Sequence, residues 1–237
     1  MIETYYAGAY WLARHESAEA CARRAEALFE RLGRIEPTWR HWYETGSSFA
    51  EARERPFTPD TASFKALFER KQNRMGDGFS FWLWTGDSPE ETTSVDGFCG
   101  SASFVPPPVC VFKPPSEGPL AHRVLTSAVL SEVVRAMALA WEPEWCVATS
   151  EQHRDMLANH GEVPDVFVGW VMYFSRQRGP VPPLPASVRV EPVEDKGTLI
   201  LLTPERFTAS NPEHVALAVR VQELLDAAGL LRPLQPG

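Results

Sequence analysis

The chain of 237 residues is 44% hydrophobic and has a net charge of −8 at pH 7. This composition is typical of a folded globular protein with a sizeable core, and the negative charge argues against direct binding of nucleic acid. No apolar run approaches the length of a membrane span, and the first residues lack the pattern of a secretory signal, so we expect a cytoplasmic protein with no membrane segment.

The four cysteines are spread along the chain and form no CxxC pair: Cys21, Cys99, Cys110 and Cys146. This spacing favours reduced, buried thiols over a zinc site or a disulfide framework. We therefore expect neither a metal ion nor another cofactor.

The first third of the chain predicts a strand followed by helices. "YYAGAYW", from Tyr5 to Trp11, has two semi-apolar faces, which favours a strand covered on both sides. A helix is expected from the N-cap residue Ser17 until Gly33, because apolar residues recur at helical spacing between them. "PTWRHWYETG" predicts a short helical turn, and a second helix is expected over 61–75.

The middle of the chain changes to the period of strands. "FSFWLWTGD" predicts a strand with two apolar faces, followed by an acidic loop from Asp87 to Asp96. "VDGFCGSASF" and "PVCVFKPP" predict two more strands, so the three should form an antiparallel meander. The residues from Pro119 to Trp141 predict the longest helix, which should be the central element of the core.

The remaining elements alternate between strands and helices. "WCVATS" and "VFVGWVMYFS" predict strands on either side of a short exposed helix, "EQHRDMLANHG". "SVRVEPV" and "GTLILLT" predict two strands joined by a polar turn, and a last helix should start at Asn211-Pro212 and end at Gly229. The pattern predicts one α+β domain over residues 1–237, with a mainly antiparallel sheet and about four to six packed helices.

Common catalytic signatures are absent, but one nuclease formula matches literally. Asp165 after Pro164, with Glu194 and Lys196 further on, satisfies the loose "PD…ExK" pattern of metal-dependent nucleases. The context argues against this alternative, because "EPVEDKGT" is typical of an exposed turn rather than a core strand. His153 and His160 would lie on one face of a helix, but they could hold a metal only if another segment supplied further ligands.

The chain as a whole resembles the bacterial polymorphic-toxin immunity proteins called immunity protein 52. The resemblance rests on "YYAGAYW", "ESAEACARR", "WRHWYETG", "FSFWLWTGD", "VGWVMYFS" and "GTLILLTPERFTASNPEHVA", and it covers about residues 3–228. It implies an α+β antidote without catalytic activity, which binds a cognate nuclease toxin of the restriction-endonuclease-like class. Such toxins are often delivered by type VI secretion systems.

The motif residues of that family carry no binding site over to this chain, so we infer contacts from physical chemistry alone. Acidic side chains suit the basic surface that a nuclease presents to phosphates, and Trp and Tyr are common interface anchors. We expect Trp11, Trp82 and Trp170 in the core. "YYAGAYW" should be mostly scaffold, with Tyr6 or Tyr10 as a further candidate for contact with the partner. The candidate toxin-binding residues are Asp87, Glu90, Glu91 and Asp96 in one patch, Glu151, Asp155, Glu162 and Asp165 in a second, and Trp39 or Trp42 as an exposed anchor.

Overall fold

One antiparallel sheet of eleven strands organises the described residues, 2–158 and 164–234, of this computed structural model. The strand order is β10-β11-β9-β8-β1-β7-β6-β5-β2-β3, and β4 pairs with β5 beside this path. The strands are β1 Tyr5–Tyr10, β2 Trp42–Glu44, β3 Pro56–Phe57, β4 Arg74–Met75, β5 Gly78–Thr85, β6 Thr93–Cys99, β7 Val109–Lys113, β8 Trp145–Ser150, β9 Val171–Ser175, β10 Arg189–Val193 and β11 Gly197–Leu201.

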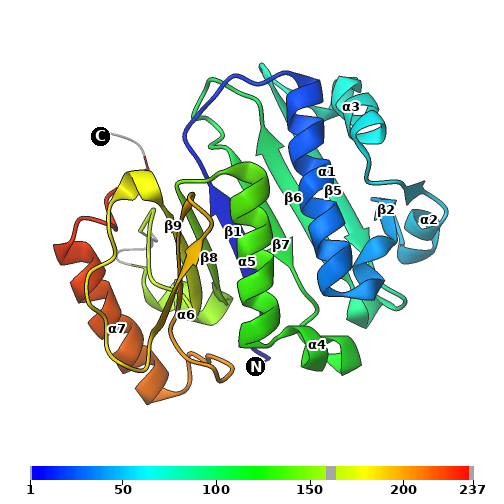
Figure 1. The fold of residues 1–237 in the computed structure, drawn as a ribbon. Coiled ribbons are helices and arrows are strands. Elements are labelled where there is room, and N and C mark those ends of the chain that lie inside the picture. Colours follow the sequence, from blue (N-terminus) through cyan, green and yellow to red (C-terminus); the bar gives the residue numbers. More distant parts are fainter. Residues whose placement is uncertain (1, 159–163, 235–237) are drawn as a thin grey trace.

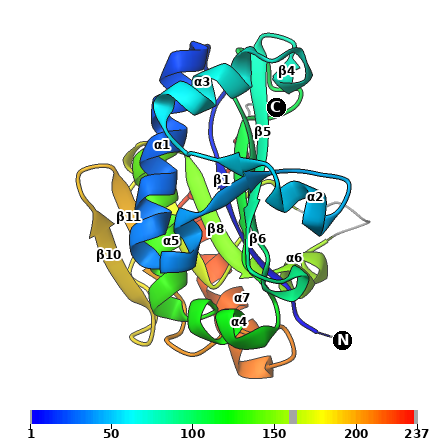
Figure 2. The ribbon, with the colours of Figure 1, turned by 90° about the vertical axis from the view of Figure 1, so that its right-hand side faces the viewer.

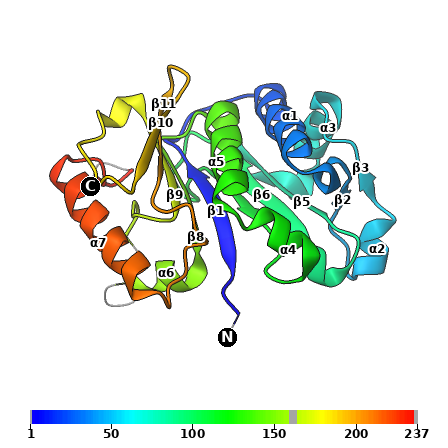
Figure 3. The same ribbon diagram turned by 60° about the horizontal axis from the view of Figure 1, so that its bottom comes forward.

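Helices lie on both faces of the sheet. The α-helices are α1 Ala18–Ile35, α2 Phe49–Arg53, α3 Thr61–Glu69, α4 Gly118–Val124, α5 Ser127–Trp141, α6 Glu151–Met156 and α7 Pro212–Ala227. In Figure 1, α1 and α5 lie side by side across one face. Figure 2 shows the sheet close to edge-on, with α2 and α6 on the opposite face, and Figure 3 shows α7 on the side of β8 to β11 that faces away from α5.

The expected α+β class with a mainly antiparallel sheet is confirmed. Seven α-helices occur in the described residues, against the four to six expected, because the predicted helix over 119–141 is two helices bent by 75° and the short helix α2 was not predicted. Thr126 causes the break: it is extended, and its side chain caps α5 by accepting the amide hydrogen of Val129 at 3.3 Å. The longest helix is therefore α1, which begins as predicted after its N-cap Ser17 and continues past Gly33 to Ile35.

Within the described residues, no single helix is long and apolar enough to cross a membrane. Only the bent pair of α4 and α5 meets the length and composition criteria together.

Three further boundaries differ from those predicted. The helix expected over 61–75 ends at Glu69, and a turn of 3₁₀ helix over Lys71–Asn73 then leads into β4. The strand expected over 166–175 is regular only from Val171, although residues 166–170 are buried. The acidic loop ends at Thr92, so Asp96 belongs to β6 and not to a loop.

The first strand lies at the centre of the sheet, between β7 and β8. Ala7 pairs with both Phe112 and Ala148, and Tyr5 pairs with Ser150. Side chains on both faces of β1 are buried, as the sequence predicts: Tyr5 is 2% exposed and Tyr6 is 5% exposed. This strand joins the meander β5-β6-β7 to the strands β8 to β11.

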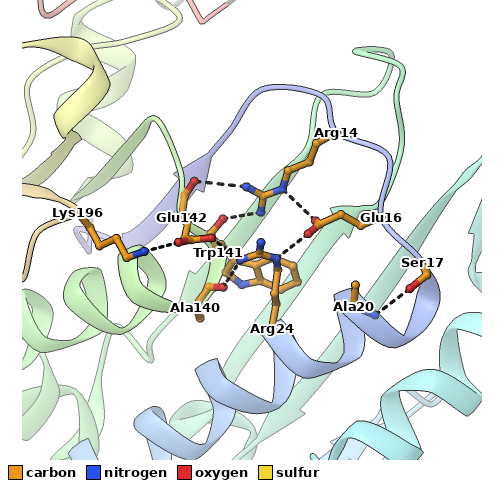
Figure 4. Close-up of polar contacts among 9 residues, drawn as sticks. All are labelled: Arg14, Glu16, Ser17, Ala20, Arg24, Ala140, Trp141, Glu142 and Lys196. Atoms are coloured by element: carbon orange, nitrogen blue, oxygen red, sulfur yellow. Dashed lines mark hydrogen bonds and ion pairs between the residues drawn. The ribbon is translucent and has the colours of Figure 1, made fainter.

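An ion-pair network ties the end of α5 to three other segments (Figure 4). Arg24 of α1 donates to the carbonyl oxygen of Ala140 and to Glu142, both at 3.1 Å, and Lys196 donates to Glu142 at 2.7 Å. Arg14 donates to the carbonyl oxygen of Trp141 at 2.5 Å. The carbonyl groups that a helix leaves unpaired at its C-terminus are thus satisfied by cationic side chains, which the helix dipole favours.

Candidate functional site

A cavity of about 450 Å³ lies on the face of the sheet opposite α1 and α5, over the central strands β1, β7 and β6. The helices on this face are at the sides, with α6 and α7 beside β8 and β9 and the short α2 beside β5 (Figures 2 and 3). The cavity is lined by Tyr6, Tyr10, Trp11, Asp96, Phe104, Pro107, Pro108, Val111, Lys113, Trp145, Glu151, Arg154, Pro164, Asp165, Phe167 and Leu234.

The register of the strands places the floor residues in rows across the sheet. Asp96 of β6 is opposite Val111 of β7 on one side and Trp82 of β5 on the other. Val111 is in turn opposite Gly8 of β1. Directly paired side chains of an antiparallel sheet project to the same face, so Trp82, Asp96 and Val111 are neighbours on the open face.

The side of the floor nearest β8 is aromatic. The Tyr10 ring stacks on Trp145 with a centroid distance of 5.0 Å, and Trp145 meets the edge of Phe167 at 5.1 Å. Phe104, Pro107 and Pro108, from the connection between β6 and β7, form another part of the lining. Rigid rings and prolines lose little conformational freedom on binding, which suits a recognition surface.

The cavity contains charges of both signs, and two of these side chains, Arg154 and Glu151, have polar partners within the protein. Arg154 donates to Asp155 at 2.7 Å and lies over the Tyr6 ring at 5.6 Å. Glu151 accepts a hydrogen bond from the Thr4 hydroxyl at 2.7 Å. Asp96 differs, because no described residue donates a hydrogen bond to its carboxylate. Burial raises the pKa of Asp96, and the charge of Lys113 opposes this shift.

The structure divides the first predicted acidic patch. Asp96 lines the cavity, whereas Asp87 pairs with Arg53 at 3.3 Å in a separate depression. Glu90 is exposed on the turn Pro89–Glu91, and Glu91 accepts the amide hydrogen of Leu120 at 3.0 Å at the start of α4. These loop residues therefore do not line the cavity to which Asp96 belongs.

The second predicted patch lies largely around the cavity. Glu151 and Asp165 line it, and Asp155 is exposed next to it through its pair with Arg154. Glu162 lies outside the described residues. The geometry thus brings Asp96, Glu151 and Asp165 together from three different segments of the chain.

The tryptophan predictions were right for two residues and wrong for three. Trp11 and Trp170 are core residues, as expected. Trp39 and Trp42 are not exposed anchors, since they are 0% and 1% exposed. Inside the core, the Trp39 indole donates to the Thr93 hydroxyl and the Trp42 indole donates to the Trp39 carbonyl oxygen. Trp82, expected in the core, is 61% exposed, whereas Trp84 on the same face of β5 is covered by Phe49 of α2, with a centroid distance of 5.1 Å.

The nuclease alternative is not supported by the positions of its residues. Glu194 and Asp195 are exposed in the hairpin turn between β10 and β11, and Lys196 pairs with Glu142. Asp165 instead lines the cavity over the central strands. In the part of the chain that the structure describes, no three His, Cys, Asp or Glu side chains are grouped to hold a metal ion.

The structure does not support metal binding by His153 and His160 either. His153 is buried, its Nε2 lies 3.1 Å from the carbonyl oxygen of Val168, and its ring meets the edge of Phe207 at 4.8 Å. His160 is outside the described residues. The role of His153 is therefore structural.

Sequence reasoning missed Val111, Lys113, Arg154 and the three lining residues of the connection before β7. A signal existed for the first two, because "PVCVFKPP" alternates buried Cys110 and Phe112 with Val111 and Lys113. It could not be recognised as a site, since alternation does not reveal which face of a central strand stays uncovered.

Comparison with known proteins gives a family match and a structural likeness. Residues 3–234 match the family described as Imm52, immunity protein 52. No curated protein is significantly similar to the chain. The Pseudomonas aeruginosa T6SS protein PA0821 is similar in structure, with a TM-score of 0.58 and 13% sequence identity over 99% of this chain and 76% of that one. At this identity the likeness shows a shared fold.

Proposed function

The chain belongs to the immunity protein 52 family, and from this premise we propose that it neutralises a cognate restriction-endonuclease-like nuclease toxin by forming a stoichiometric complex with it. Immunity proteins are inhibitors that bind their cognate toxins and are not catalysts. The observation that carries the proposal is the match over residues 3–234, which includes every strand and helix of the fold.

The nuclease class of the toxin is supported by charge. A nuclease has to present Lys and Arg around its active site to hold phosphates, and a protein of net charge −8 is attracted to such a surface. The cavity over β1, β7 and β6 adds three carboxylates within an aromatic surface, from Asp96, Glu151 and Asp165. This combination of aromatic anchors and acidic groups is suited to binding a basic protein surface.

The setting of the inhibition is part of the same proposal. The likeness to a T6SS protein of Pseudomonas aeruginosa supports a role in type VI secretion, with the immunity protein protecting the producing cell and its kin. We place the complex in the cytoplasm, where an incoming nuclease reaches DNA. Inhibition can follow from plugging the active site or from covering the route to it.

Co-expression tests this function directly. Cells that express the toxin domain encoded beside the gene of this chain should die, and co-expression of the chain should restore growth. The purified proteins should form a complex that survives gel filtration, and DNA cleavage should cease at one equivalent of the chain. Cell death despite co-expression, together with the absence of a complex, would refute the proposal.

A second assay checks the kind of toxin. The toxin alone should degrade DNA with magnesium or manganese, and the chain alone should leave DNA intact under the same conditions. A toxin that kills cells without degrading nucleic acid, yet is still neutralised by the chain, would retain the immunity function and reject the nuclease class.

A further inference from the structure

One half-buried carboxylate of the open face has no partner of its own. Asp96 lies in β6 with its side chain on the uncovered face, and among the described residues its surroundings supply burial and the charge of Lys113 but no hydrogen bond. Holding a carboxylate away from water without a partner is unfavourable. Such a group suggests a site whose partner comes from another molecule.

The neighbours of Asp96 have the shape and chemistry to hold a flat cation. Trp82, directly opposite in β5, is 61% exposed, although large aromatic side chains are usually buried. On the other side Val111 provides an aliphatic wall, and the Tyr10 ring lies beyond it on the cavity floor. An arginine guanidinium can stack on an aromatic ring while donating two hydrogen bonds to a carboxylate, and a lysine ammonium cannot do both in this way.

We propose that Asp96, Trp82, Val111 and Tyr10 form a socket for one arginine side chain of the toxin. This inference rests on the proposed function, because it names the chemistry of the contact within that complex. The socket lies at the edge of the cavity, which Asp96, Val111 and Tyr10 line, and the exposed Trp82 beside Asp96 adds a side chain of the kind common among interface anchors.

The two cations of the cavity do not occupy this position in the free protein. Arg154 is held by Asp155 and by the Tyr6 ring, on the opposite side of β1 from Asp96. Lys113 is exposed at the end of β7 and forms no ion pair with a described residue. Its charge helps to keep Asp96 ionised and leaves the hydrogen-bonding capacity of the carboxylate free.

The test measures binding of the toxin domain encoded beside the gene of this chain, with its metal-binding carboxylates replaced by alanine. Asp96→Asn and Trp82→Ala should each raise the Kd about 30-fold or more, which is typical of an interface anchor. Asp87→Asn and Glu90→Gln remove charge from exposed positions outside the cavity and should change the Kd less than about 3-fold. The effect of Asp96→Asn should persist in high salt, because a buried pair is screened less than an exposed one.

A double-mutant cycle identifies the partner. One arginine of the toxin, replaced by glutamine, should weaken binding to the wild-type chain strongly and binding to Asp96→Asn only slightly. Equal effects of Asp96→Asn and Asp87→Asn, or no arginine coupled to Asp96, would overturn the socket. If the socket fails these tests but the wild-type chain binds the toxin, the proposed function stands. If the wild-type chain does not bind the toxin, the proposed function itself is refuted.

Folding controls keep these outcomes interpretable. Asp96→Asn removes a charge that burial disfavours, so its thermal unfolding temperature should equal or exceed that of the wild type. Trp82→Ala removes an exposed ring and should leave that temperature nearly unchanged. Loss of binding in variants that stay folded therefore reports on the socket.

Discussion

The Tyr10 ring lies over Gly8, so that a Cβ atom on residue 8 would approach the Tyr10 hydroxyl oxygen to 2.6 Å. This close approach lets Tyr10 lie along the sheet and stack on Trp145. A side chain at position 8 would push the ring away from the floor of the cavity.

We therefore expect Gly8→Ala to destabilise the protein by about 1 to 3 kcal/mol, the usual cost of forcing an extra carbon into a packed region. Urea denaturation measures this loss. The double variant Gly8→Ala/Tyr10→Ala should be no less stable than Tyr10→Ala alone, because the clash has been removed. Additive losses would show that Tyr10 does not cause the effect.

Trp39 should contribute to stability rather than to binding. Its ring is fully buried, meets Phe112 at 4.9 Å and donates to the Thr93 hydroxyl at 3.1 Å. Trp39→Ala should lower the free energy of unfolding by about 3 to 5 kcal/mol, as is usual for removal of a large buried ring. The matched variant Trp82→Ala should change it by less than about 0.5 kcal/mol, since that ring is exposed. Similar losses from both variants would contradict the observed burial.

His153 should make stability depend on pH. Burial lowers the pKa of His153 below its ordinary value of 6.5, although the Val168 carbonyl and Glu3 oppose the shift. The unfolded chain therefore takes up the proton first, so stability is full above about pH 6.5 and falls as the pH drops toward the lower pKa of the folded state.

The measurement is the free energy of unfolding at pH 7.5 and pH 5.5, for the wild type and for His153→Gln. The loss between the two pH values should be smaller in the variant. His122→Gln, at an exposed position of α4, should lose as much stability as the wild type. An unchanged loss in His153→Gln would rule out this histidine as the source.

Glu142 should stabilise the end of α5 only while it is ionised. The hydrogen bond from Lys196 lowers the pKa of Glu142, and that from Arg24 adds to the effect, while burial opposes both. A carboxyl with a lowered folded pKa contributes stability above its unfolded pKa, and this contribution disappears as the pH falls through the folded pKa.

Glu142→Gln should therefore cost about 0.5 to 1 kcal/mol at pH 7, the scale of exposed ion pairs, and almost nothing near pH 3. Urea denaturation at both pH values tests this difference. Glu69→Gln, at an exposed position of α3, is the control and should have little effect at either pH. A cost for Glu142→Gln that does not depend on pH would mean that packing, not charge, is responsible.

Local signals in the sequence were sufficient for many elements of this fold. Ser17 caps α1 and Asn211-Pro212 starts α7 because capping depends on a few adjacent residues. The turn between β10 and β11 was also predicted, since the polar residues after Val193 separate two apolar strands. The break at Thr126 is not evident from the pattern, because apolar residues continue across it on both sides.

The site was harder to predict because it depends on which face of the sheet is covered. "FSFWLWTGD" is apolar on both faces, and only the packed structure shows that Phe81 meets α1 while Trp82 faces outward. In the same way, the sequence predicts Asp96 as the last residue of the acidic loop, but the pairing of β6 with β5 and β7 places it on the cavity floor. The positions of Trp82 and Asp96 thus depend on strand pairing and helix packing between distant segments of the chain.

The central position of β1 has a consequence for biosynthesis. Tyr5 pairs with Ser150 and Ala7 with Phe112, so β1 in a nascent chain cannot pair on both sides until the segment through Ser150 has left the ribosome. Until then, β1 lacks one or both of its neighbouring strands, and its aromatic residues need protection from aggregation.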